Sequence, residues 1–382
     1  MLYQIIVTII LAALAVNLVF NLRALKKPHR KLAVNNCYPM ISILVPARNE
    51  ERNITACLKS LRKQNYAQYE ILVLDDNSTD KTADVVEALA AADSRLRLIS
   101  GKALPVDWAG KPHACYQLAR AAKGDWLLFV DADTTFEPEM LGSVMDFALE
   151  QRPSLLSGFP HQKMDGFPQK LVIPMIYFIM LACTPLWWIQ ASAKPRPALA
   201  IGQFLLFSRE EYWRIGGHAA VKARIMEDVW LSCEITRKGG RHITVDLSSL
   251  VSCNMYRKLG DMWEGFAKWI YSVATLSPIA IVLLLMLAYV LFLSPYIMLY
   301  YDLFIASYAS GWRLLLVLQI LIIIFMRSML DHIFRVPVVS AILHPLGFAY
   351  LVMVAIYASL QVLAGKGVRW KNRLYSHKSG IS

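Results

Sequence analysis

The sequence lacks both glycine-rich signatures by which nucleotide-binding loops are commonly recognised. No Walker loop and no GxGxxG pattern occurs in its 382 residues, so neither a P-loop NTPase nor a dinucleotide-binding domain is indicated. The six cysteines are dispersed and include no CxxC pair, a pattern that indicates neither a zinc site nor a disulfide framework. Dispersed thiols are typical of small buried side chains in a reducing compartment.

Charged residues are also scarce, at 18% of the chain, whereas 56% of the residues are hydrophobic, which is high for a soluble protein. Charged residues are absent mainly from a few segments. Residues 1–22 and 276–301 carry no charge, 314–326 are apolar apart from Gln319, and 336–364 contain no Asp, Glu, Lys or Arg. Stretches near 20 apolar residues are long enough to span a bilayer. We therefore predict an N-terminal transmembrane anchor at 1–23 and a C-terminal transmembrane region at 275–365.

Basic residues follow the first apolar segment, at Arg23, Lys26, Lys27, Arg30 and Lys31. The segment has no basic start and no clear small-residue cleavage site, which favours a signal anchor over a cleaved signal peptide. Its basic side is expected in the cytoplasm. The protein is thus predicted to be a multi-pass plasma-membrane protein whose region between the anchor and residue 275 is cytoplasmic.

The C-terminal topology allows two interpretations. Three spans after residue 275 would leave the basic tail at 366–382 outside the cell, against the positive-inside rule. A hairpin of 277–293 and 296–310, split at Ser294-Pro295, would return the tail to the cytoplasm, and an amphipathic or re-entrant second half is the alternative. The net charge of +12 (40 basic minus 28 acidic residues) is explained by such flanks and by anionic lipid, so no nucleic-acid partner is expected.

Between the anchor and residue 275 the pattern is that of an α/β domain. Short apolar runs alternate with helical periodicity, which predicts a mostly parallel sheet covered by helices on both faces. The predicted strands are 41–45, 71–74, 96–99 and 127–130, and the predicted helices are 50–63, one from about Thr79, and 111–122.

Polar residues gather where three of these strands end. The strands run into Pro46–Glu51, Asp75–Asp80 and Asp131–Asp133, and ligands of such sheets bind at the carboxyl ends of the strands. The Asn49–Glu51 and Ser78-Thr79 groups are also ordinary helix caps, so this alternative stays open. Asp131 and Asp133 either lie in solvent or help to hold Mg²⁺ or Mn²⁺, with water and phosphate oxygens as further ligands.

Four motifs carry a resemblance to family 2 glycosyltransferases, which have a GT-A nucleotide-sugar-binding fold. The similarity covers roughly residues 40–270 and predicts a catalytic domain at 38–272. The motifs are Val45-Pro-Ala-Arg-Asn-Glu-Glu51, Val73-Leu-Asp-Asp-Asn-Ser-Thr-Asp80, Val130-Asp-Ala-Asp133 and Met226-Glu-Asp-Val-Trp230. Further pieces are similar to the membrane-attached members that glycosylate carotenoid acids (4,4'-diaponeurosporenoate-type) and hopanoid-type lipids, namely Gly110–Tyr116, Met262–Lys268, His344–Leu346 and Trp370–Tyr375.

The resemblance implies a role for each matching residue. The nucleotide-sugar would be bound by Pro46, Ala47, Arg48, Glu50, Asp76, Lys111 and Asp131, with Asp76 at the uracil edge and Asp131 at the ribose. Asp133 would be the metal ligand for Mg²⁺ or Mn²⁺. Asp228 would be the catalytic base, with Glu227 as the alternative base.

The implied reaction is a metal-dependent, inverting transfer of a sugar, with UDP-glucose as the expected donor, to a membrane lipid such as a carotenoid or terpenoid. A carboxylic acid is already ionised near pH 7, so a base at Asp228 favours a hydroxyl acceptor. The family's Gln-x-x-Arg-Trp block, found in its polymer-making members, lacks its glutamine at Gly265–Trp269. The alternatives are a polysaccharide synthase of the same family and a non-catalytic nucleotide-sugar sensor or scaffold.

The apolar segment 171–189 would divide the site residues between the two sides of the membrane if it crossed once. We therefore expect an interfacial helix with Trp187 and Trp188 at the headgroup level. A buried helix of the catalytic domain is the alternative.

Overall fold

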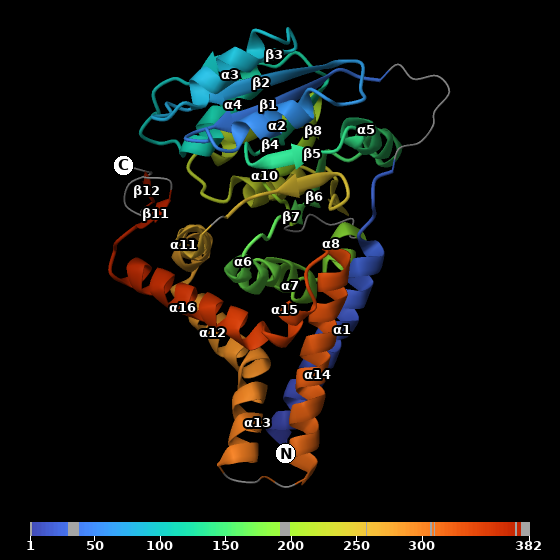
Figure 1. Ribbon diagram of the computed structural model, residues 1–382, viewed down its shortest axis with the longest axis vertical. Helices are drawn as coiled ribbons and strands as arrows, with labels where there is room; N and C mark the ends of the chain where they lie inside the picture. The colour runs from blue at the N-terminus through green and yellow to red at the C-terminus, as the bar shows by residue number, and fades with distance from the viewer. Residues whose placement is uncertain are drawn as a thin grey trace. The chain divides into compact units, whose positions relative to one another are not determined.

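The computed structural model describes residues 2–29, 38–191, 199–256, 258–305, 308, 310–370 and 373–375. The chain divides into two compact units. Among the described residues, the α/β unit comprises Leu25–Lys163 and Trp188–Met255, and the helical unit comprises those before residue 25, Met164–Trp187 and those from Tyr256 to residue 375 (Figure 1). Arg30 and Lys31 after the first apolar segment, and residues 371–372 and 376–382 of the basic tail, lie outside the described residues.

A seven-stranded sheet forms the centre of the α/β unit. Its strand order is β3-β2-β1-β4-β8-β6-β9. All neighbours run parallel except β8, which is antiparallel to both β4 and β6. The predicted mostly parallel sheet is thereby confirmed. The strands are β1 (Ile41–Ala47), β2 (Tyr69–Asp75), β3 (Leu96–Ser100), β4 (Trp126–Val130), β6 (Leu155–Phe159), β8 (Phe204–Ser208) and β9 (His242–Asp246).

Both faces of this sheet are buried, which explains why its strands read as continuous apolar runs. Alternate residues of β1 enter different cores: Ile43 and Val45 belong to one cluster and Leu44 to the other. Residues of three helices join the first cluster, α2 (Ile54–Leu61), α3 (Thr82–Ala90) and α5 (Met140–Gln151). The second cluster includes residues of α4 (Gly110–Ala121), α9 (Arg209–Arg214), η1 (Gly217–Val221) and α10 (Glu227–Arg237).

A second, three-stranded sheet lies in the same unit and was not expected from the sequence. Its central strand β10 (Val251–Cys253) pairs antiparallel with β5 (Thr134–Phe136) and parallel with β7 (His161–Gln162). In this register Cys253 lies opposite both Thr134 and Gln162. The short sheet therefore brings the end of β10 beside the residues that directly follow Asp133.

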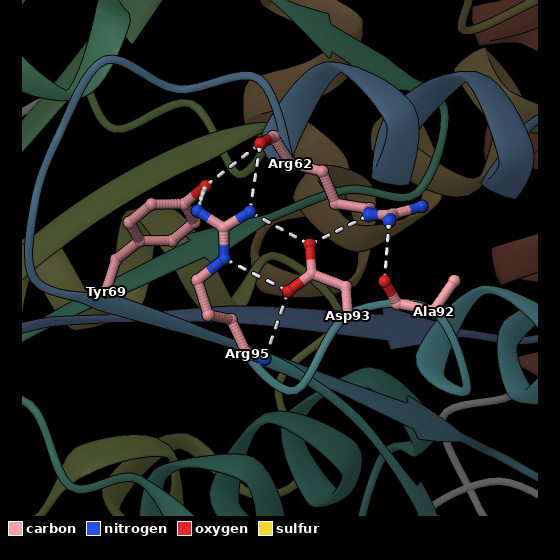
Figure 2. A network of polar contacts seen from close by, with 5 residues as sticks. All are labelled: Arg62, Tyr69, Ala92, Asp93 and Arg95. Atoms are coloured by element: carbon pink, nitrogen blue, oxygen red, sulfur yellow. Dashed lines mark hydrogen bonds and ion pairs between the residues drawn. The ribbon is translucent and has the colours of Figure 1, made fainter.

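Figure 2 shows a polar network around Asp93, just before β3. The Asp93 carboxylate accepts hydrogen bonds from Arg62, which follows α2, and from Arg95. Arg95 also donates to the Tyr69 hydroxyl at 2.5 Å, and Arg62 donates to the Ala92 carbonyl at 3.2 Å. The network thus joins α2, β2 and β3 at the edge where β2 begins.

We expect Asp93→Asn to lower the free energy of unfolding by about 1–2 kcal/mol at neutral pH, because charged hydrogen bonds are lost from a partly solvated network. Hydrogen bonds from Arg95 and Arg62 hold the pKa of Asp93 well below its ordinary value. Its stabilisation is therefore present above the unfolded-state pKa and is lost as the pH falls below about 4. Unfolding of both proteins at several pH values measures this, with the exposed Asp84→Asn as control; an equal deficit at pH 7 and at pH 3 would contradict it.

The helical unit contains the apolar segments. Three helices among the described residues have the length and hydropathy of membrane spans, namely α1 (Leu2–Ala24), α14 (Ser310–Ile333) and α16 (His344–Leu363). Gln319 of α14 donates to the Gln4 side chain at 2.8 Å and to Thr8 at 2.9 Å. Such interhelical hydrogen bonds between polar side chains hold spans together in lipid, where apolar burial contributes little. The other helices of this unit are α6 (Phe167–Val172), α7 (Pro174–Ala182), α11 (Leu259–Leu276), α12 (Pro278–Phe292), α13 (Ser294–Phe304) and α15 (Val339–Ile342). The boundary between the two units falls within α8 (Leu186–Ala191), after Trp187.

The expected hairpin at Ser294-Pro295 is replaced by a bend. Helices α12 and α13 meet at an angle of 44°, so the chain does not reverse direction there. Pro295 stands in the first turn of α13, where proline starts a new helix without a lost hydrogen bond. The pair is therefore one bent fourth candidate span or a re-entrant segment.

The segment 171–189 is likewise broken, into α6, α7 and α8. Pro174 begins α7 directly after α6 ends. Within the helical unit Tyr177 stacks on Phe334 at 3.8 Å between ring centroids, and Phe178 packs edge-on against Phe292. The segment is therefore partly a buried helix, and an interfacial position for its exposed end at Trp187 remains a prediction.

Two further boundaries differ from those predicted. Helix α11 was placed at the end of the catalytic domain but belongs to the helical unit, where Trp263 packs against Tyr350 and Tyr357 of α16. Part of the predicted tail forms the paired strands β11 (Val368–Trp370) and β12 (Arg373–Tyr375). The orientation of this region in a membrane stays a prediction.

Candidate active site

Three acidic strand ends meet at one edge of the large sheet. Strands β2, β1 and β4 are consecutive neighbours in its order (Figure 1). In the register of the first pair Ala47 lies opposite Asp75, and the Asp76 amide donates to the Ala47 carbonyl at 2.8 Å. The loops after β1, β2 and β4 are therefore adjacent, which brings together residues from three distant parts of the sequence.

The loops after β1 and β2 hold each other by hydrogen bonds. The Asn49 amide donates to the Ser78 hydroxyl at 3.0 Å, and the Thr79 amide donates to the Asn49 side chain at 2.8 Å. Ser78 and Thr79 thus join the two loops and do not cap α3, which begins only at Thr82. Asn49 itself is in the left-handed region, with φ of 54°, which asparagine tolerates better than most residues.

Arg48 and Glu50, two of the predicted nucleotide-binding residues, both take part in this loop structure. Arg48 donates from Nη1 to the Asp76 carbonyl at 2.6 Å. Glu50 is buried, its amide donates to the Thr82 hydroxyl at 2.8 Å, and its carboxylate accepts from Asn53 at 2.8 Å. Both residues therefore position the loops that border the site.

Lys111, near the start of α4, lies between two acidic residues from other elements. Its Nζ is 2.7 Å from Asp131 Oδ1, at the end of β4, and 3.1 Å from Glu227 Oε1, at the start of α10. Burial acts against the charged ammonium, but the carboxylates of Asp131 and Glu227 prevail and raise the pKa of Lys111 well above its ordinary value. The ammonium therefore remains charged and joins two segments of the site.

Asp228 is half-buried beside this ion pair. Its Oδ2 accepts from the Gly202 amide and its Oδ1 from the Val229 amide, each at 2.8 Å. Burial is the main cause that raises the pKa of Asp228 to about 6, and the neighbouring Glu227 acts in the same direction, whereas Lys111 lowers it. A carboxylate with a pKa near 6 can accept a proton close to neutral pH.

Glu227 and Asp228 are adjacent in sequence but differ in environment. Glu227 is 5% exposed and bound to the Lys111 ammonium, whereas Asp228 keeps part of its surface open. Burial and the ion pair leave Glu227 little access to a substrate. The geometry separates the two candidate bases in a way that their sequence positions did not.

Asp131 connects this group with a second acidic group that contains Asp133 and Glu50. The pKa values of the buried thiols Cys57 and Cys253 are raised by burial, and further by the charges of Asp133, Asp131 and Glu50. The charges of all three carboxylates thus reach both thiols, and one of these thiols, Cys253, donates to Asp133 Oδ1 at 3.4 Å. The predicted metal residue and two predicted nucleotide-binding residues thus share one region.

The residues around Asp133 fit a divalent cation that is only partly ligated by protein. Within the described ranges no cluster of three or more His, Cys, Asp or Glu forms a complete metal site. Mg²⁺ and Mn²⁺ are commonly held by one or two carboxylates together with substrate phosphates and water. Asp131 and Asp133, which follow β4, supply two carboxylates of this kind.

Sequence reasoning missed three residues of this region, Gly202, Gln203 and Cys253. A Cβ on Gly202 would lie 3.0 Å from Asp228 Oδ2 and 3.2 Å from Lys111 Nζ, so a side chain there would crowd both groups. Gln203 donates to Cys253 Sγ at 2.9 Å, and Cys253 donates to Asp133 Oδ1 at 3.4 Å. No local pattern marks these residues, because only the pairing of β10 with β5 and β7 brings Cys253 to Asp133.

Comparison with known proteins agrees with this geometry. Residues 42–207 match the model of glycosyl transferase family 2, a range that contains the three acidic strand ends and Lys111 but ends before Asp228. The 4,4'-diaponeurosporenoate glycosyltransferase of Staphylococcus haemolyticus is 27% identical over 231 residues, 60% of each chain. The protein of the same name from Staphylococcus aureus is 28% identical over 255 residues, which cover 66% of this chain and 65% of the relative.

The match spans about three fifths to two thirds of the length of these curated relatives. Among solved structures, the mannosyltransferase PcManGT from Pyrobaculum calidifontis, in complex with GDP-Man and Mn²⁺, is similar with a TM-score of 0.54 and 20% identity. The similarity covers 93% of this chain and 99% of that one. At this identity the structural likeness concerns the fold.

Proposed function

We propose that this chain, which carries a family 2 glycosyltransferase domain with a GT-A fold, transfers one sugar from a nucleotide-diphosphate donor to a membrane lipid with inversion of configuration. One observation carries the proposal. The half-buried Asp228, with a pKa near 6, lies beside the Lys111–Asp131 ion pair at the carboxyl edge of the sheet. This supports a proton acceptor next to the edge at which we propose that the nucleotide binds, in a chain with apolar helices long enough to span a membrane.

The donor would bind along the ends of β1, β2 and β4. Pro46 and Ala47 at the end of β1, with the loop that Arg48 and Glu50 hold, would line the nucleotide. Asp76, at the end of β2, would accept a hydrogen bond from the uracil edge. Asp131 would face the ribose, oriented by its 2.7 Å contact with Lys111. UDP-glucose is the donor we propose.

Asp133 would hold Mg²⁺ or Mn²⁺, and the bound cation would neutralise negative charge on the diphosphate. The proton transfer is carried out by a residue of the chain. Asp228 accepts the proton of an acceptor hydroxyl while the acceptor oxygen bonds to the anomeric carbon. The bond between that carbon and the diphosphate oxygen breaks on the opposite face, and the nucleoside diphosphate leaves with the electron pair. A single displacement converts an α-linked donor into a β-glycoside.

The acceptor is proposed to be a lipophilic molecule such as a carotenoid or terpenoid. Two lines support this: the relatives named for 4,4'-diaponeurosporenoate and the apolar helices of the helical unit. A base with a pKa near 6 favours a hydroxyl acceptor over a carboxylate, since a carboxylate has no proton to lose at neutral pH. The protein would be a multi-pass plasma-membrane enzyme with its catalytic domain in the cytoplasm.

Mass spectrometry of membrane lipids from cells with and without this protein tests the proposal. We expect one lipid species heavier by a single hexose, present only when the protein is active. The purified full-length protein in nanodiscs, supplied with UDP-glucose and that lipid, should form the same product. A product with a ladder of sugars would indicate a polysaccharide synthase, and donor binding without any product would indicate a sensor or scaffold. Either outcome would contradict the proposal.

A further inference from the structure

Asp133 is contacted by a buried chain of hydrogen bonds that the proposed reaction does not use. Gln162 of β7 donates from Nε2 to Gln203 Oε1 at 2.8 Å, and Gln203 donates from Nε2 to Cys253 Sγ at 2.9 Å. Cys253 then donates to Asp133 Oδ1 at 3.4 Å. Gln162, Gln203 and Cys253 are at most 5% exposed, so no solvent competes for these bonds.

The donors in this chain all act in one direction. The Cys253 thiol is the donor to Asp133 Oδ1, and a thiol has a single S–H proton to supply. The Gln203 amide donates to the sulfur, and its carbonyl oxygen is occupied by Gln162. Each member therefore fixes the orientation of the next, and the last bond is made to one oxygen of Asp133.

The backbone holds Asp133 at the same place. The Asn254 amide, next to Cys253, donates to the Asp133 carbonyl at 3.0 Å. Cys253 itself lies opposite Thr134 in the ladder between β10 and β5. The main chain and the side chain of Asp133 are thus both held by the end of β10.

We propose that Cys253 is a positioning residue that fixes the Asp133 carboxylate for cation binding, with Gln203 and Gln162 orienting its thiol. This inference rests on the proposed role of Asp133 as the metal ligand. With Oδ1 held from the protein side, the carboxylate loses rotational freedom and its other oxygen is presented in a constant direction. Hydrogen bonds behind a ligating side chain typically change metal affinity by about 10- to 100-fold when removed. A thiol is a weak donor, so we expect the lower end of that range.

The test is a titration of Mn²⁺ by electron paramagnetic resonance on the full-length protein in detergent with UDP present, which measures free Mn²⁺ directly. Cys253→Ala should raise the Kd for Mn²⁺ about tenfold. Cys253→Ser should keep it within about threefold of the native value, since its hydroxyl can replace the S–H donor. Gln203→Leu, which removes the donor to the sulfur, should give an intermediate loss and serves if Cys253→Ala does not fold. Cys115→Ala, an equally buried thiol of α4, should bind Mn²⁺ as tightly as the native protein.

The results distinguish a failure of the Cys253 role from a failure of the proposed metal-binding role of Asp133. Unchanged Mn²⁺ binding in both Cys253→Ala and Gln203→Leu, with binding lost in Asp133→Ala, would overturn the positioning role and leave the metal site standing. Unchanged binding in Asp133→Ala would instead contradict the metal assignment itself. A thiolate charge-transfer band with Co²⁺ that disappears in Cys253→Ser would make Cys253 a ligand, which also overturns the positioning role.

Discussion

Asp228→Asn is expected to lower kcat for sugar transfer by about a thousandfold, while Asp228→Glu should retain part of the activity. Asparagine preserves the size of the side chain and one acceptor oxygen, so it can still accept from Gly202 or Val229. It cannot take a proton from the acceptor, and a positioned general base contributes about 10²- to 10⁴-fold. Transfer of radiolabelled sugar to lipid, followed under saturating donor, measures the loss.

The pH profile gives a second signature of the same residue. Because burial raises the pKa of Asp228 to about 6, the carboxyl is protonated and inactive below that value. Activity of the native enzyme should therefore rise through about pH 6 with a slope of one on logarithmic axes. Glu234→Gln, an acid paired with Arg237 on the same helix, is the matched control and should keep both rate and profile. Normal turnover in Asp228→Asn would reject Asp228 as the base.

Lys111→Met is expected to lower the rate of sugar transfer at pH 7 by about a hundredfold. The loss of the ammonium charge has two effects: it breaks two ion pairs and it raises the pKa of Asp228. Asp131 and Glu227 lose the cation that lies 2.7 and 3.1 Å from them, so the loop after β4 is no longer joined to the start of α10. In addition, Lys111 lowers the pKa of Asp228 in the native protein, and an opposite charge nearby is worth one to three pKa units. Its removal should therefore move the acid limb of the profile upward by about one unit or more.

The measurement is kcat and KM for donor across pH 5–9, with unfolding followed in parallel. A purely structural role for Lys111 would reduce the amount of active protein without moving the acid limb, so an unchanged limb would contradict the electrostatic role. Lys102→Met removes an exposed lysine shortly before the same helix and should change neither quantity. Partial recovery of the Lys111→Met rate at high pH, where Asp228 is ionised again, is the expected distinguishing result.

Much of the α/β unit follows from local pattern. The buried runs at Ile41, Ile71, Leu96 and Leu127 became β1 to β4, because apolar residues without period are buried on both faces of a parallel sheet. Their order in the sheet places the ends of β2, β1 and β4 together. Charges at successive strand ends thus predicted which loops lie side by side, since parallel strands end on the same side of the sheet.

Other features depended on contacts between distant residues. The bend at Ser294-Pro295 and the break at Pro174 are both at prolines, but hydropathy alone cannot tell a bend from a hairpin or a broken helix from a continuous one. The helix that contains Trp263 had an amphipathic pattern compatible with either unit. Its ring contacts with α16 assign it to the helical unit.

The sequence by itself determined the class of domain, the acidic strand ends and the presence of helices long and apolar enough to span a membrane, because burial and chain direction leave periodic, local traces. The tertiary structure decided how the charges are paired. Asp131 and Glu227 are 96 positions apart (227 minus 131), yet both bind Lys111, which leaves Asp228 as the more accessible acid. It also placed Cys253 behind Asp133. Electrostatic and hydrogen-bonding partners are set by distance in space, and only the packing of the sheets determines that distance.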